Sequence, residues 1–130
     1  MAFEYVDTQS KISLAAGADL SSDQYKIVKL SGSGVILTAA ITDIPVGVLQ
    51  NDPASGETAS VAVDGITKVV ASEAISVGAL IGTTDDGKAV DVVAGTDTTA
   101  YVIGQAVTAA TADGDVITIT LDCKSPARAA

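Results

Sequence analysis

Val116-Ile117-Thr118-Ile119-Thr120-Leu121-Asp122, near the end of the 130-residue sequence, is the stretch that decides the fold class. Three large apolar residues, Ile117, Ile119 and Leu121, alternate with threonine and aspartate. In an extended chain this alternation places the apolar side chains on one face and the polar side chains on the other. The stretch is therefore predicted to be a half-buried β-strand, and Asp113-Gly114 before it marks a turn.

Short apolar runs between turn-forming residues continue toward the N-terminus and predict further strands. Asp64-Gly65 and Thr84-Asp85-Asp86-Gly87 are hairpin signals, and Ser31-Gly32-Ser33-Gly34 is a turn. Further strands are expected at 25–30, 35–41, 45–49, 58–63, 66–71, 79–83, 88–93 and 101–107. No run has the apolar spacing of a full amphipathic helix. The predicted fold class is all-β, as a compact β-sandwich or small β-barrel of about nine short strands.

The chain is expected to form one domain with an extension at each end. We expect an N-terminal arm at 1–20, a β domain at 21–123 and a polar, alanine-rich C-terminal tail at 124–130. In the arm, Phe3, Tyr5 and Val6 are apolar residues flanked by charged ones. The first residues fit equally an extended arm with one short strand and a frayed terminus.

Composition limits the partners of the protein. Hydrophobic residues make up 48% of the sequence but aromatic residues only 3%, so the core must be built from small and β-branched side chains. The few aromatic side chains leave little flat surface for stacking sugars or bases. The net charge of −9 argues against nucleic acid and anionic membranes as partners. No signal peptide or membrane-spanning run is recognisable, which favours a cytoplasmic protein or one in a particle assembled there.

Residues that carry catalysis or bind metals are scarce. The sequence has no histidine and one cysteine, Cys123, which argues against the common catalytic triads, histidine-based metal sites and an internal disulfide. Cys123 is expected to be a small residue at the end of the last strand. The pairs Asp85-Asp86 and Asp113/Asp115 lie at turns, where hydrated carboxylates are expected in place of a catalytic pair or a calcium site. No catalytic residue, metal site or cofactor is therefore predicted.

Several short motifs occur in an order that resembles a known family. Ile44-Pro45-Val46-Gly47-Val48 precedes a turn-rich stretch that ends in Ala54-Ser55-Gly56-Glu57. A glycine within a predicted strand, as at Gly47, often marks a bulge or a close approach of two backbones. The motifs that follow are Val61-Ala62-Val63-Asp64-Gly65, Ile75-Ser76-Val77-Gly78-Ala79-Leu80, Ile103-Gly104-Gln105-Ala106 and the final strand. Over about 42–122, this order resembles the small phage capsid cement, or head decoration, proteins of the DUF2190 type.

The resemblance implies a structural function without catalytic residues. Proteins of this family sit outside a head shell of the HK97 type, commonly as trimers, and clamp neighbouring major capsid proteins. By this resemblance the chain is expected to be a homotrimer on the capsid exterior of the virion, made in the bacterial host cytoplasm. Phe3, Tyr5 and Val6 are the predicted capsid contacts.

Two other classes of function stay open at this point. A carbohydrate- or receptor-binding β module of a phage or bacterial surface structure needs a pocket with aromatic and polar groups. Only Phe3, Tyr5, Tyr25 and Tyr101 could supply the aromatic groups. An enzyme, such as a metal-free hydrolase that uses two aspartates, needs a buried pair of carboxyl groups with different pKa values.

Overall fold

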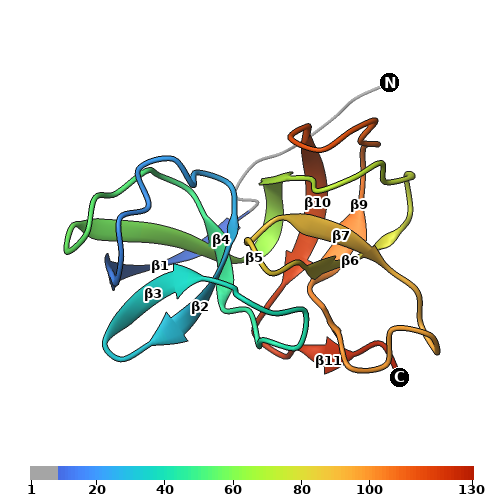
Figure 1. Ribbon diagram of the computed structural model, residues 1–130, viewed down its shortest axis with the longest axis horizontal. Helices are drawn as coiled ribbons and strands as arrows, with labels where there is room; N and C mark the ends of the chain where they lie inside the picture. The colour runs from blue at the N-terminus through green and yellow to red at the C-terminus, as the bar shows by residue number, and fades with distance from the viewer. Residues whose placement is uncertain (1–8) are drawn as a thin grey trace.

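The computed structural model of the protein describes residues 9–130, and residues 1–8, with the predicted capsid contacts Phe3, Tyr5 and Val6, lie outside the described part. The described residues form eleven strands and no helix, which confirms the predicted all-β class (Figure 1). The strands are β1 (Gln9–Ala16), β2 (Ile27–Ser31), β3 (Gly34–Leu37), β4 (Gly47–Leu49), β5 (Thr58–Val70), β6 (Leu80–Thr83), β7 (Ala89–Val92), β8 (Tyr101–Val102), β9 (Gly104–Ala106), β10 (Val116–Asp122) and β11 (Ala127–Arg128).

Nine strands form one sheet in the order β1-β3-β2-β4-β5-β10-β9-β6-β7, and β11 pairs with β8 in a second, two-stranded sheet. Because β1 pairs with β5 as well as with β3, the first five strands close into a ring. In the order of the sheet, β5, β10, β9, β6 and β7 form the other half. A bridge between Ala71, just after β5, and Ala89 in β7 leads from β7 back to the end of β5. Figure 1 shows the two halves side by side, with β5 running from one into the other.

The predicted hairpin at Asp64-Gly65 is wrong, because β5 continues through both residues as one 13-residue strand. Its first part pairs with β1 and β4, and its second part pairs with β10, with Gly65 opposite Leu121. Gly65 has a φ of 100°, a conformation that glycine adopts without steric cost. Asp64-Gly65 therefore does not form a turn, because long-range pairing on both sides of β5 outweighs the local preference for one.

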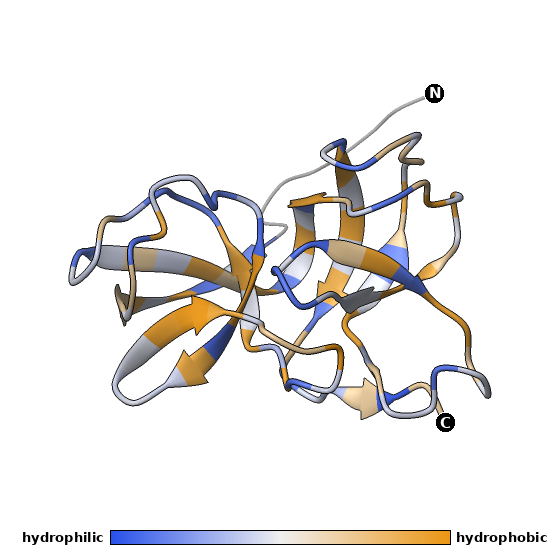
Figure 2. Cartoon of the chain, viewed as in Figure 1, coloured by the Kyte–Doolittle hydropathy of each residue, from blue (hydrophilic) through white to orange (hydrophobic). Residues whose placement is uncertain are grey.

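Two buried clusters share the side chains of β5. Ala59 and Val61 belong to a cluster inside the ring, whereas Val69 belongs to a larger one in the second half. The larger cluster also includes Ile27, Val48 and Ala62 from the ring strands, so the two halves pack against each other. Figure 2 shows apolar residues along the strands and polar residues concentrated in the loops between them.

Both ends of the described chain are part of this packing. Within the expected arm at 1–20, β1 pairs with β5 from Gln9 to Ala15, and Leu20 is only 1% exposed. Within the expected tail at 124–130, β11 pairs with β8 and Ala129 is buried. Residues 9–20 and 127–129 thus contribute to the fold, while the division of the chain into functional parts stays a prediction.

Candidate functional site

The carboxylates singled out in the sequence lie in surface turns. Asp86 accepts a hydrogen bond from the Thr84 hydroxyl, which holds the pKa of Asp86 below its ordinary value. Hydrogen bonds from the Thr111 amide and hydroxyl lower the pKa of Asp115 in the same way. A carboxyl group with a lowered pKa is a poor general acid at neutral pH. Across residues 9–130, no three histidine, cysteine, aspartate or glutamate side chains are grouped so that they could hold a metal ion.

Cys123 directly follows β10 and is 8% exposed. Burial, with the nearby charge of Asp122, raises the pKa of the Cys123 thiol to about 12. The thiolate is the nucleophilic form of cysteine, so this thiol is unreactive at neutral pH. Its place at the end of the last long strand is the one predicted from the sequence.

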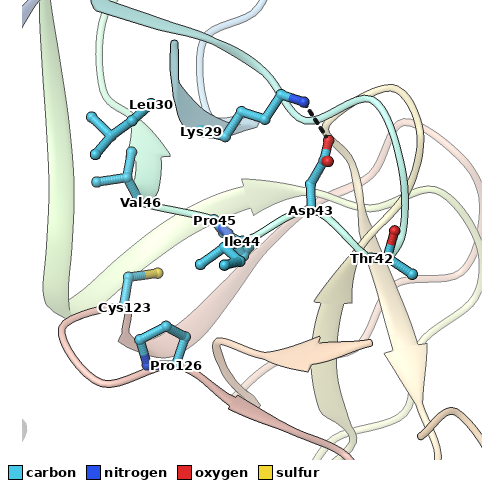
Figure 3. Close-up of a pocket in the computed structure, with 9 residues that line it drawn as sticks. All are labelled: Lys29, Leu30, Thr42, Asp43, Ile44, Pro45, Val46, Cys123 and Pro126. Carbon is cyan, nitrogen blue, oxygen red and sulfur yellow. Dashed lines mark ion pairs between the residues drawn. The ribbon is translucent and has the colours of Figure 1, made fainter. Parts of the chain in front are cut away.

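A hollow in the described surface, named groove 1 here, lies where the ring meets the C-terminal segment. Its volume is about 630 Å³. Leu30 and Ile44 are 60% and 57% exposed beside it, so two large apolar side chains border the same hollow. Figure 3 shows its nine lining residues, which are Lys29, Leu30, Thr42, Asp43, Ile44, Pro45, Val46, Cys123 and Pro126.

Asp43 fixes the loop that forms one wall of groove 1. Its carboxylate accepts hydrogen bonds from the amides of Ala39 and Ala40, at 2.7 and 3.1 Å, and pairs with Lys29 at 2.8 Å. The hydrogen bond with Lys29 is the main reason that the pKa of Asp43 is lowered. Because Lys29 and Asp43 neutralise each other, the wall presents apolar side chains without a net charge.

Gly47 allows the chain to return to the sheet directly after the residues that line groove 1. A Cβ at Gly47 would lie 2.1 Å from the carbonyl oxygen of Ala62, so β4 can approach β5 closely only with glycine there. The close approach of two backbones, one of the sequence predictions for Gly47, is thus confirmed. The predicted strand at 45–49 is shorter in the structure, since β4 begins at Gly47 and leaves Pro45 and Val46 to line the groove.

A second hollow of about 310 Å³, named groove 2, lies between the start of β1, the second part of β5 and β10. The Gln9 side chain donates to the Ile66 carbonyl at 2.9 Å and thereby fixes the entry of the chain into the fold at the rim of this groove. Val107 is 45% exposed there. The lining residues are Gln9, Ile66, Thr67, Lys68, Val107, Thr108 and Thr118.

No local pattern in the sequence predicted either groove. Leu30, Ile44 and Pro126 come from three distant segments, and only the pairing of β2 with β4 and the return of the C-terminal segment bring them together. Within residues 9–130, no aromatic side chain lines either groove. The described residues contain no helix that is long and apolar enough to cross a membrane.

The sequence matches a protein-family model described as phage cement protein over residues 7–121. This match covers most of the chain. The chain belongs to the phage cement protein family. The resemblance seen in the motifs is thereby confirmed, and this phage cement protein is a capsid-associated structural protein of the virion.

A solved structure similar to this phage cement protein is the head fiber gp8.5 N base in bacteriophage phi29. The two chains are 24% identical, with a TM-score of 0.64 over 88% of this chain and 95% of the other. At this identity the likeness shows a shared fold. No curated protein matches the sequence.

Proposed function

We propose that this phage cement protein decorates the outside of an HK97-type head shell as a homotrimer and stabilises contacts between neighbouring major capsid proteins. On this proposal it is made in the bacterial host cytoplasm, joins the shell there and has no catalytic activity. The observation that carries the proposal is an all-β body, of a cement family, with two separate surface grooves that expose apolar side chains. Clamping requires at least two contact surfaces on one molecule, and we assign these to groove 1 and to the N-terminal residues.

Groove 1 is the proposed contact between copies of the chain. Each copy carries a net charge of −9, so copies repel unless they meet through an uncharged surface. Groove 1 offers such a surface, because the charges of Lys29 and Asp43 are paired with each other. Burying the exposed parts of Leu30 and Ile44 contributes on the order of 1–2 kcal/mol each to such a contact.

The N-terminal residues are proposed to contact the shell. Phe3, Tyr5 and Val6 are apolar, and Phe3 and Tyr5 are half of the four aromatic residues of the chain. Aromatic side chains contribute strongly to interface energies. The segment joins the body at Gln9, where a short extended chain can reach a neighbouring protein through backbone hydrogen bonds and apolar contacts.

Binding to expanded, undecorated shells is the experiment that tests this function. Purified protein is expected to sediment with such shells and to raise their resistance to heat, and its native mass is expected to be three times that of one chain. A monomeric protein without affinity for shells would contradict the proposal. Removal of residues 1–8 is expected to weaken binding while the folded domain persists.

Single substitutions then test groove 1 by itself. Ile44→Asp is expected to lower the native mass to that of one chain, because it places a charge in an apolar contact. Val77→Asp is the matched control, since Val77 is 66% exposed and lines neither groove. Equal effects of the two substitutions on native mass would show that groove 1 is not the contact between copies.

A further inference from the structure

Lys68 lies at the rim of groove 2 and, like Lys11, makes no ion pair within the described residues, unlike the other four lysines. Lys26, Lys29, Lys88 and Lys124 each pair with an aspartate. For Lys68, no carboxylate within residues 9–130 lies at ion-pair distance. Its Nζ atom lies 5.6 Å from the centroid of the Tyr25 ring, and a contact with an aromatic ring orients the ammonium group without neutralising its charge.

The other residues that line groove 2 leave space for an apolar side chain of a partner, with polar residues around it. Ile66 and Val107 supply apolar walls. The Thr108 hydroxyl accepts a hydrogen bond from the Thr118 amide at 2.9 Å, which fixes the position of this wall. A volume of about 310 Å³ is at the small end of the range for binding pockets and accommodates one or two side chains.

The place of groove 2 on the molecule links it to the proposed shell contact. Gln9 lines the groove, and residues 1–8 join the chain there. The N-terminal segment that is proposed to contact the shell therefore leaves the body at the rim of this groove. A protein bound by that segment lies within reach of groove 2, because eight extended residues span about 26 Å.

We propose that groove 2 binds an extended segment of the shell protein in which an apolar side chain stands next to a carboxylate. The apolar side chain enters between Ile66 and Val107, and the carboxylate pairs with Lys68. This inference rests on the proposed function, and the charge of Lys68 selects the partner: a cation that no carboxylate of residues 9–130 pairs with favours an acidic segment over a basic or neutral one. Groove 1, where the charges are already paired, lacks this selectivity.

Charge reversal at Lys68 tests the proposal with expanded, undecorated shells as the probe. Lys68→Glu is expected to weaken shell binding about fivefold or more at low salt, and the difference is expected to shrink at about 0.5 M salt, where exposed charges are screened. Val107→Asp is expected to weaken binding at both salt concentrations, because it blocks the apolar part of the groove. Both variants must keep the native mass and the melting temperature of the unchanged protein.

Arg128→Glu is the matched control. It changes the net charge by the same amount, and the Arg128 guanidinium also lies over an aromatic ring, at 5.3 Å from the Tyr101 centroid, but it lines neither groove. Equal losses for Lys68→Glu and Arg128→Glu would mean that only overall charge matters, and would overturn the inference. So would a Lys68→Glu effect that vanishes in protein lacking residues 1–8, because the groove would then hold the chain's own N-terminus. Failure of the unchanged protein to bind shells would instead contradict the proposed function itself.

Discussion

The hydroxyl groups of Thr38 and Thr83 hydrogen-bond to each other between the two halves of the sheet. Thr38 follows β3 in the ring, and Thr83 ends β6 in the other half. Each residue is only 1% exposed, so the hydrogen bond is shielded from water. The Thr38 hydroxyl also lies 3.4 Å from the carbonyl oxygens of Ile27 and Thr84. These contacts form a buried polar link between the two halves.

Removing one hydroxyl from this link is expected to destabilise the fold. Thr83→Val should lower the free energy of unfolding by about 1–3 kcal/mol, because the Thr38 hydroxyl loses a buried partner. The double variant Thr38→Val/Thr83→Val should lose less than the sum of the two single variants. Denaturant unfolding measures these differences, and Thr98→Val, at an exposed residue, is the control. Additive losses in the double variant would show that the two hydroxyls are not coupled.

Gly47→Ala is expected to disturb the contact between β4 and β5. The new methyl group would lie 2.1 Å from the Ala62 carbonyl oxygen and 2.7 Å from Val61 Cγ1, so the strands must move apart. The expected loss of stability is about 2–3 kcal/mol, which is typical of overpacking. Gly95→Ala should cost less, because no atom lies within 4 Å of a Cβ at Gly95 and only its positive φ opposes the change. A smaller loss for Gly47→Ala than for Gly95→Ala, measured by thermal unfolding, would contradict this account.

Stability is expected to fall in acid because of carboxylates such as Asp115. Hydrogen bonds from the Thr111 amide and hydroxyl hold the pKa of Asp115 below its ordinary value of 3.8. A carboxyl group with a lowered pKa in the folded state stabilises the fold above its unfolded pKa, and this contribution is lost as the pH falls through the folded pKa. The melting temperature should therefore be steady from neutral pH to about 5 and decline below about 4.

Asp115→Asn should lower the melting temperature at neutral pH and weaken its decline in acid. Asp85→Asn is the comparison, since the Asp85 side chain makes no hydrogen bond or ion pair within the described part of the chain. It should leave the melting temperature at neutral pH nearly unchanged. Calorimetry between pH 7 and 3 distinguishes the two variants, and identical profiles would show that Asp115 does not contribute.

Truncation is expected to show that residues 1–8 and β1, the strand that follows them, differ in their importance for folding. A chain that begins at Gln9 should keep its fold, whereas one that begins at Gly17 should lose it. The second truncation removes β1, which pairs with both β3 and β5 and so closes the ring. It also exposes the cluster that contains Val35, Leu49 and Val61. Far-ultraviolet circular dichroism and melting curves test both forms, and a stable fold without β1 would show that the ring closes by other contacts.

Cys123 is expected to resist alkylation in the folded protein. Its pKa of about 12, against an ordinary 9.0, reduces the thiolate fraction at pH 8 about a thousandfold, and burial limits access further. Iodoacetamide should therefore modify the thiol at least about a hundredfold more slowly in the native protein than in urea. Equal rates would mean that the segment after β10 opens readily in the native state.

The local signals in the sequence were reliable where neighbouring residues pair with each other. Ser31 and Gly34 close the hairpin of β2 and β3, and the residues 84–87 connect β6 with β7, as predicted. Prediction failed at Asp64-Gly65, where an equally good turn signal lies inside β5. A turn signal reports only the preference of a few residues. At Gly65 that preference is outweighed by pairing with β1 and β10, which are distant in the sequence.

The sequence by itself determined the all-β class and the composition of the core, because period-two alternation and abundant valine, threonine and alanine act locally, strand by strand. It also established the lack of histidine and the strongly negative charge. Only the tertiary structure decided that β5 joins a closed ring to a second half, and that Leu30, Ile44 and Lys68 border two grooves. These features depend on side chains brought together from distant segments, and the pairing that places them depends on cooperative packing along the whole chain.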